Sequence, residues 1–190
     1  ASHDRAARAQ KDGLFEDEIV PVTIPQRRGE PVVLKDDEGI RVGTTAESLG
    51  GLRAAFADGG NVTAGNASQL SDGGAAVVVT TKAMADKLGV EPLAEIIDYA
   101  EVAGPDTSLL TQPSRSTARA LERAGMQLSD VDLFEFNEAF AAVSIASMAE
   151  LGLSDDVVNV NGGAIALGHP IGMSGTRLAI TLAYELKRRG

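Results

Sequence analysis

A glycine-rich stretch, residues 159–176, carries His169, one of only two histidines in the chain. An apolar β-branched run at 157–160 precedes it, and a long apolar helical pattern follows it. The stretch holds five of the 21 glycines, and glycines this dense let the backbone turn sharply and approach another group closely. Pro170 biases His169 towards an extended conformation. The pattern indicates an imidazole held on a stiff loop, an arrangement that suits polar chemistry better than packing.

A purely structural turn is the alternative for this stretch, because many histidines only satisfy a hydrogen bond. A phosphate-binding loop is disfavoured, since no Lys and Ser/Thr follow in the Walker order and the G-x-G-x-x-G spacing is absent. His169 therefore needs support from other parts of the chain.

The composition is that of a folded α/β protein. The 190 residues can form one large domain or two small ones with a sizeable core. Hydrophobic residues make up 44% and charged residues 23%, which is ordinary for a globular protein. With seven aromatic residues, no Trp and many Ala, Gly and Val, the chain favours closely packed α/β layers.

Charge and cysteine content exclude several function classes. A net charge of −10 and the absence of a basic stripe argue against a nucleic-acid partner. No apolar run of about 20 residues predicts a membrane span, and the first residues, 1–5, lack the apolar region of a signal peptide. No cysteine is present, so we expect neither disulfides nor a thiol nucleophile on this chain, and a cytoplasmic location.

Helices and strands are expected to alternate from Ala75 onward, which favours layered α/β structure with crossover connections. The predicted helices are 4–13, 49–56, 82–88, 113–124, 138–151 and a last helix ending at Arg189. The predicted strands are 18–25, 31–34, 75–81, 93–103, 131–136 and 157–160. Asn137 directly follows one of these strands, and the carboxyl ends of strands are where α/β sheets place their sites.

Three stretches resemble the motifs of thiolases, and more closely those of acetyl-CoA acetyltransferases and 3-ketoacyl-CoA thiolases. They are Asn-Glu-Ala-Phe-Ala at 137–141, Asn-Gly-Gly-Ala-Ile-Ala-Leu-Gly-His-Pro-Ile-Gly at 161–172, and Ala-Gly-Asn-Ala-Ser at 64–68 followed by Ser-Asp-Gly-Gly at 71–74. The resemblance covers essentially all 190 residues, which look like the middle and later half of a thiolase.

The resemblance implies a layered α/β/α/β/α thiolase fold that is incomplete in this chain. Residues 1–70 would belong to the loop domain that binds CoA. Residues 71–91 would be the final strand and helix of the N-terminal domain, and 92–190 the C-terminal domain without its last strands.

The resemblance implies a Claisen condensation and its reverse, in which negative charge builds on a thioester oxygen. His169 would donate a hydrogen bond to that oxygen and support a nucleophilic thiolate. Asn137 would hold a water that completes the oxyanion site. One such donor is typically worth about 10²–10³ in rate.

Four polar positions resemble the family's CoA contacts. Ser68 and the main chain at Ala64 would contact the pantetheine arm. Arg41 and Ser48 would contact the nucleotide part of CoA, where a guanidinium suits an adenine or a phosphate.

Phe56 and Phe140 would be apolar walls of the substrate tunnel, with plain core packing as the alternative. The resemblance implies CoA and acyl-CoA as substrates, no permanently bound cofactor or metal, a role in fatty acid metabolism, and a homodimer or homotetramer.

The chain departs from the family pattern at its cysteines. Thiolases use a nucleophilic Cys from an N-terminal segment and an acid/base Cys from a later glycine-rich turn, and neither is present here. We therefore expect these 190 residues alone to be inactive and to contribute half of an active site. Alternatives are a non-catalytic CoA- or acyl-binding protein, a ketoacyl-ACP synthase, which usually has His where this chain has Asn137, and a generic nucleotide-binding α/β domain.

Overall fold

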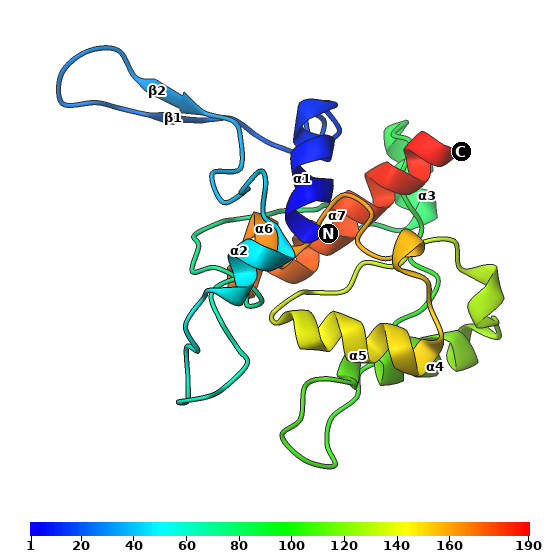
Figure 1. Ribbon diagram of the computed structural model, residues 1–190. Coiled ribbons are helices and arrows are strands. Elements are labelled where there is room, and N and C mark those ends of the chain that lie inside the picture. Colours follow the sequence, from blue (N-terminus) through cyan, green and yellow to red (C-terminus); the bar gives the residue numbers. More distant parts are fainter.

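The structure is a computed structural model that describes residues 1–190, and it consists of helices joined by long extended segments (Figure 1). The helices are α1 Ser2–Lys11, α2 Ala46–Gly50, α3 Lys82–Leu88, α4 Gln112–Ala124, α5 Ala141–Leu151, α6 Ala164–Leu167 and α7 Ile171–Arg189. Two 3₁₀ turns lie at Leu128–Asp130 and Asp155–Val157, and the strands are β1 Val22–Ile24 and β2 Val32–Leu34. None of the helices combines the length and apolarity that a membrane crossing requires.

The two strands form an antiparallel hairpin in which Val22 pairs with Leu34. The hairpin projects away from the helices (Figure 1), and its valines are more than half exposed. The strands predicted at 18–25 and 31–34 therefore form, but each is shortened to three residues, with a polar turn between them.

Glycine ends three of the helices. Gly89, Gly125 and Gly152 follow α3, α4 and α5 in the left-handed conformation, with φ of 66°, 68° and 68°. This conformation strains any residue with a Cβ. The predicted ends of these helices are confirmed for that reason.

Two predicted helix starts are wrong. The short helix predicted at 49–56 instead spans Ala46–Gly50: it begins earlier because Thr45 and Ser48 form a capping box, and residues 51–56 are not helical. The helix predicted from Glu138 begins at Ala141, because the preceding residues stay extended and hydrogen-bond to another segment.

The strands predicted at 75–81 and 93–103 do not form. Both segments lack ladder hydrogen bonds, and their side chains are largely exposed, with Val78 at 95% and Ile96 at 71%. Their β-branched composition is typical of a strand, but a strand needs a neighbour, and no other strand of these 190 residues lies alongside.

Helix α4 holds part of the second segment instead. Arg123 Nε donates to Asp98 Oδ1 at 3.0 Å, and Arg119 Nη1 donates to the Glu101 carbonyl at 3.2 Å. The arginines lie one helical turn apart, and the later one, Arg123, contacts the earlier residue of the segment. The extended segment therefore runs antiparallel to the helix. These side chains take the place of ladder partners.

Two further predicted strands, at 131–136 and 157–160, are reduced to one parallel bridge between Phe134 and Val158. The Phe134 N–H donates to the Val157 carbonyl and the Asn159 N–H to the Phe134 carbonyl, both at 2.9 Å. Phe134, Phe136 and Val158 form the buried apolar cluster. This bridge brings the ends of the two segments to the same edge.

Helix α1 covers the second of these strand ends. Ala6 and Ala9 are fully buried, and a Cβ on Gly162 would lie 2.7 Å from the Ala6 Cβ. Arg5 Nη1 donates to the Val158 carbonyl at 2.9 Å. Small residues on both sides therefore let the helix lie directly against the loop that leads to His169.

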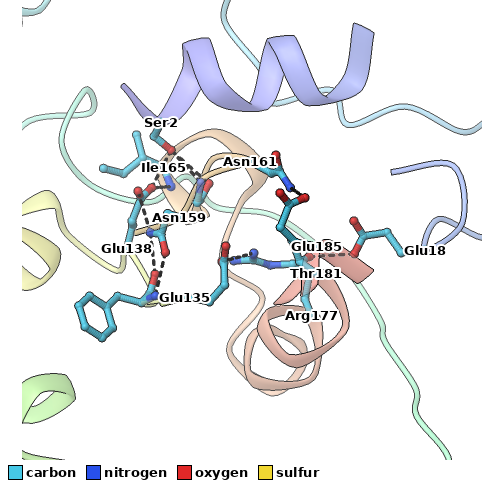
Figure 2. Close-up of polar contacts among 12 residues, drawn as sticks. Ser2, Glu18, Glu135, Glu138, Asn159, Asn161, Ile165, Arg177, Thr181 and Glu185 are labelled. Carbon is cyan, nitrogen blue, oxygen red and sulfur yellow. Dashed lines mark hydrogen bonds and ion pairs between the residues drawn. The ribbon is translucent and has the colours of Figure 1, made fainter. Parts of the chain in front are cut away.

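The buried face of α7 is polar. Ser174, Thr181 and Glu185 are only 3%, 1% and 8% exposed, and their spacing places them on one helix face. Thr181 donates to Glu18 Oε2 at 2.8 Å, and Asn161 Nδ2 donates to Glu185 Oε2 at 2.8 Å (Figure 2). Side-chain hydrogen bonds therefore hold this face of the helix against the rest of the chain.

Arg177 on the same face points at Glu135 (Figure 2). The closest N–O distance is 3.5 Å, and the Glu135 side chain is 4% exposed. Burial raises the pKa of Glu135 to about 8, although the Arg177 charge lowers it. A carboxyl with this pKa is mostly protonated at neutral pH.

This pKa predicts a pH-dependent stability. The folded-state pKa of Glu135 lies above its ordinary value of 4.5, so its contribution is complete below pH 4.5 and is lost as the pH rises towards 8. The free energy of unfolding should fall on the order of a few kcal/mol over that window because of this group.

Glu135→Gln should flatten this fall in urea unfolding measured from pH 5 to pH 8. Burial also raises the pKa values of Glu18 and Asp37, so part of the slope should remain. Glu30→Gln, on the exposed hairpin turn, controls for the loss of one charge. An unchanged slope in Glu135→Gln would contradict the prediction.

Candidate active site

The structure brings Asn137 and His169 together. Asn137 Nδ2 lies 3.0 Å from His169 Nε2 and 3.5 Å from Nδ1. Asn137 lies at the end of the first strand segment, and His169 ends the glycine-rich loop that follows the second. Both residues are half-buried. A carboxamide and an imidazole from distant parts of the chain thus converge on one point.

Ser174 contacts the other ring nitrogen. Its Oγ lies 2.5 Å from His169 Nδ1 and donates to the Pro170 carbonyl at 3.0 Å. When the Ser174 hydroxyl hydrogen points at the Pro170 carbonyl, the hydroxyl oxygen accepts a hydrogen bond from Nδ1–H. Nε2 then carries the lone pair that accepts from Asn137 Nδ2.

A second proton arrangement also satisfies the ring. If the Ser174 hydroxyl turns to donate to Nδ1, Nε2 carries the hydrogen and becomes a donor. Asn137 Oδ1 is buried and has no hydrogen-bond partner, so it can accept this hydrogen once the amide turns. The site can therefore present either a lone pair or an N–H at Nε2.

Gly168 and Ser71 fix the loop just before the imidazole. The His169 N–H donates to Ser71 Oγ at 3.0 Å. Gly168 has φ of 88°, and a Cβ there would lie 2.3 Å from Ser71 Oγ. Only glycine allows both this conformation and this approach.

The polar segment that contains Ser68 lies against the other motif. The Ser68 N–H donates to the Ala139 carbonyl at 3.0 Å, and the Ala141 N–H donates to the Asn66 carbonyl at 2.8 Å. These bonds hold the segment beside residues 139–141, which directly follow Asn137 and Glu138. The three stretches that carry the family resemblance are therefore neighbours in space.

The segment that contains Ala64 lies against α2, the helix that contains Ser48. A Cβ on Gly65, next to Ala64, would lie 2.4 Å from the Leu49 Cδ2 of α2. Ser48 is exposed, but its hydroxyl donates to the Thr45 carbonyl at 2.9 Å.

Arg41 is exposed, and its guanidinium makes no hydrogen bond or ion pair within the chain. Its backbone N–H donates to His3 Nδ1 at 3.2 Å. The structure does not bring Arg41 into contact with Asn137 or His169.

Phe56 and Phe140 face each other edge to face, with ring centroids 6.3 Å apart. Phe56 is 76% exposed, so the alternative of plain core packing is wrong for this residue. Phe140 is half-buried beside the Ser68 segment. The two rings form one apolar surface that remains open to solvent.

Asn137 and His169 line a cleft of about 1060 Å³. Its other wall includes residues 100–103 of the extended segment held by α4. Within the chain, no group of three or more His, Asp or Glu side chains could hold a metal ion.

Three polar residues next to the site were not predicted from the sequence. They are Ser174, Glu138 and Asn159. Glu138 directly follows Asn137 in a motif that carries the resemblance, and that position is a signal. A buried role for Asn159 has no clear sequence signal, because asparagine after a strand is typical of a turn.

Two family models match the chain. Residues 1–83 match the thiolase N-terminal domain, and residues 90–190 match the thiolase C-terminal domain.

The chain belongs to the thiolase family.

Proteins similar to this thiolase-family chain include a probable acetyl-CoA acetyltransferase from Mycolicibacterium smegmatis. It is 57% identical over 189 residues, which cover 100% of this chain and 49% of that protein. An acetyl-CoA acetyltransferase from Cupriavidus necator is 52% identical over 99% of this chain and 48% of its own length. The chain thus spans about half the length of the curated relatives it matches.

Solved structures show that the fold is the α/β fold of thiolases. A Bacillus anthracis acetyl-CoA acetyltransferase superposes with a TM-score of 0.94 at 47% identity, over 100% of this chain and 48% of that chain. Human mitochondrial 3-ketoacyl-CoA thiolase gives a TM-score of 0.89 at 41% identity, with the same coverage.

Ser174→Ala should change the tautomer of the His169 ring, that is, which nitrogen carries the hydrogen, because it removes the hydroxyl that contacts Nδ1. The ¹⁵N chemical shifts of the labelled ring report which nitrogen carries the hydrogen, and His169→Gln assigns the signals. Ser116→Ala is a matched control, since Ser116 donates to the carbonyl of Pro113 in the first turn of α4 at 3.0 Å. Ring shifts that stay the same in Ser174→Ala would contradict a role for Ser174 in fixing the ring.

Proposed function

We propose that the protein containing this chain is an acetyl-CoA C-acetyltransferase. It would condense two acetyl-CoA to acetoacetyl-CoA and CoA, or cleave 3-ketoacyl-CoA with CoA in the reverse direction. The observation that carries the proposal is the distance of 3.0 Å between Asn137 Nδ2 and His169 Nε2. The names of the similar proteins, acetyl-CoA acetyltransferases and a 3-ketoacyl-CoA thiolase, support the same reaction class.

His169 and Asn137 are proposed to stabilise the thioester oxygen when it becomes anionic. Removing a proton from the methyl group of acetyl-CoA places negative charge on that oxygen. In the arrangement with hydrogen on Nε2, His169 can donate to it directly, and Asn137 Nδ2 can donate to a water that also contacts it. Fixed donors in a half-buried site need little reorganisation, which lowers the barrier.

The nucleophile and the second acid/base are proposed to come from cysteines outside these 190 residues, which contain none. A thiolate would take up the acyl group, and a second thiol would exchange the proton on the acetyl carbon. On this proposal the 190 residues alone are inactive.

The CoA contacts are proposed along the 64–68 segment and α2. Ser68 and the Ala64 main chain would contact the pantetheine arm, and Arg41 and Ser48 the nucleotide. The free guanidinium of Arg41 supports this, because an anionic ligand needs a local cation on a chain of charge −10. The open apolar surface of Phe56 and Phe140 would line the acyl or pantetheine path.

Three further features are proposed from the family. The chain would divide into a loop-domain part at 1–70, an N-terminal-domain part at 71–91 and a C-terminal domain at 92–190. The complete protein would be a cytoplasmic homodimer or homotetramer acting in fatty acid metabolism.

A non-catalytic CoA- or acyl-binding protein is the second candidate, and the absence of cysteine favours it. The intact mass of the native protein separates the two candidates. A polypeptide about twice as long as this chain, as in its relatives, supports the enzyme, and one of this length supports the binding protein.

His169→Ala in the complete protein should reduce turnover of acetoacetyl-CoA plus CoA by about 10²–10³-fold or more, because it removes an oxyanion donor. The loss of thioester-enolate absorbance measures this rate. His3→Ala, at the other histidine of the chain, is the control: His3 contacts neither Asn137 nor His169, and its Nδ1 accepts from the Arg41 backbone N–H, so any effect should appear in KM for CoA while kcat stays within about twofold. Near-normal turnover in His169→Ala would refute the proposed role.

A further inference from the structure

Asn159 extends the hydrogen-bond ladder with its side chain. Its Oδ1 accepts from the Phe136 N–H at 2.8 Å, and its Nδ2 donates to the Phe136 carbonyl at 2.9 Å. Asn159 is 2% exposed and has φ of 47°, the only positive φ outside glycine. Its amide thus replaces the backbone partner that Phe136 lacks, and it fixes the residue immediately before Asn137.

Glu138, immediately after Asn137, is 8% exposed. Its Oε1 accepts from Asn159 Nδ2 at 3.0 Å. Its Oε2 accepts from Ser2 Oγ at 2.7 Å and from the Ile165 N–H at 3.1 Å (Figure 2). One side chain therefore connects the Asn137 strand end, helix α1 and the loop that ends at His169.

All three groups around the Glu138 carboxyl are donors. Asn159 Nδ2 and the Ile165 N–H can only donate. Ser2 Oγ accepts from the Gly163 N–H at 3.0 Å, which directs its own hydrogen towards Glu138. A group that only accepts fits this position, and an amide NH₂ does not.

Gly163 gives the carboxyl its space. A Cβ at this position would lie 2.3 Å from Glu138 Cδ and 2.5–2.6 Å from its two oxygens. The glycine-rich loop is therefore shaped around the Glu138 carboxyl as well as around Ser71.

We propose that Glu138 and Asn159 are positioning residues that set the relative placement of Asn137 and His169. Neither is placed at the reacting atoms, and each acts through the backbone on either side of Asn137 and through the loop before His169. This inference rests on the proposed thiolase function and names the residues that hold its two donors in place. Displacing a catalytic group by about 1 Å can cost about 10²-fold in rate.

The test uses the isosteric variant Glu138→Gln in the complete protein. Its NH₂ must face one of the three donors, so the loop shifts while the side-chain volume stays the same. We expect kcat for thiolysis of acetoacetyl-CoA to fall about 10- to 100-fold, with KM within about threefold. The ¹⁵N shifts of the His169 ring should change as well.

Glu185→Gln is the matched control. Glu185 has the same 8% exposure and also accepts from an asparagine of this loop, Asn161, at 2.8 Å, but it lies on the α7 side, away from Asn137. It should lower the melting temperature and leave kcat within about threefold. Ser2→Ala removes one of the three donors to Glu138 and should also change the ¹⁵N shifts of the His169 ring, with a loss of kcat below the 10- to 100-fold expected for Glu138→Gln. If Glu138→Gln does not fold, unchanged kcat and ring shifts in Ser2→Ala would overturn the positioning role.

The possible results are distinct. A wild-type protein without thiolysis refutes the proposed function, and the ring shifts of Glu138→Gln then still test positioning. Wild-type kcat and unchanged ring shifts in Glu138→Gln would overturn the positioning role. So would equal losses of kcat in Glu138→Gln and Glu185→Gln, since they would show only a general loss of stability.

Discussion

Two strand ends that run parallel and finish at the same edge hold the site together. Only one backbone bridge, between Phe134 and Val158, joins them. The Asn159 side chain adds two more hydrogen bonds to Phe136 beyond that bridge. Asn137 leaves one strand end and the loop to His169 leaves the other. The separation of these two side chains is therefore set by how firmly the two ends are paired.

Buried polar side chains with hydrogen-bond partners surround the two strand ends and the loop. Glu138, Asn159, Asn161, Ser174 and Glu185 are all at most 8% exposed, and all have hydrogen-bond partners. A buried polar group that loses its partner costs about 1–3 kcal/mol, so these contacts stabilise the packing of helices α1 and α7 around the loop. Asn137 Oδ1 is one of five buried side-chain atoms without a hydrogen-bond partner, and it belongs to a residue proposed to act on substrate.

Local signals allowed part of the fold to be predicted from the sequence. Glycine after a helical pattern correctly predicted the ends of α3, α4 and α5, because the left-handed conformation at those positions is a local property. The strands at 75–81 and 93–103 were not predictable in this way. Whether an apolar β-branched run pairs depends on a neighbouring strand, which the run itself does not encode.

The site residues also divide into those that the sequence predicted and those that it did not. The motifs identified Asn137 and His169, and the structure places them 3.0 Å apart. Glu138 and Asn159 could not be assigned a role from the sequence, because their partners lie up to 136 residues away. Arg41 and Ser48 lie on exposed surface, where neither sequence nor packing specifies a ligand contact.

The most direct test of the account is a crystal structure of the complete protein with acetoacetyl-CoA bound. The thioester oxygen should lie within about 3.2 Å of His169 Nε2, with a water at hydrogen-bond distance from both that oxygen and Asn137 Nδ2. A thioester oxygen bound away from both side chains, with neither in direct or water-mediated contact, would contradict the central claim that these two groups share one developing anion.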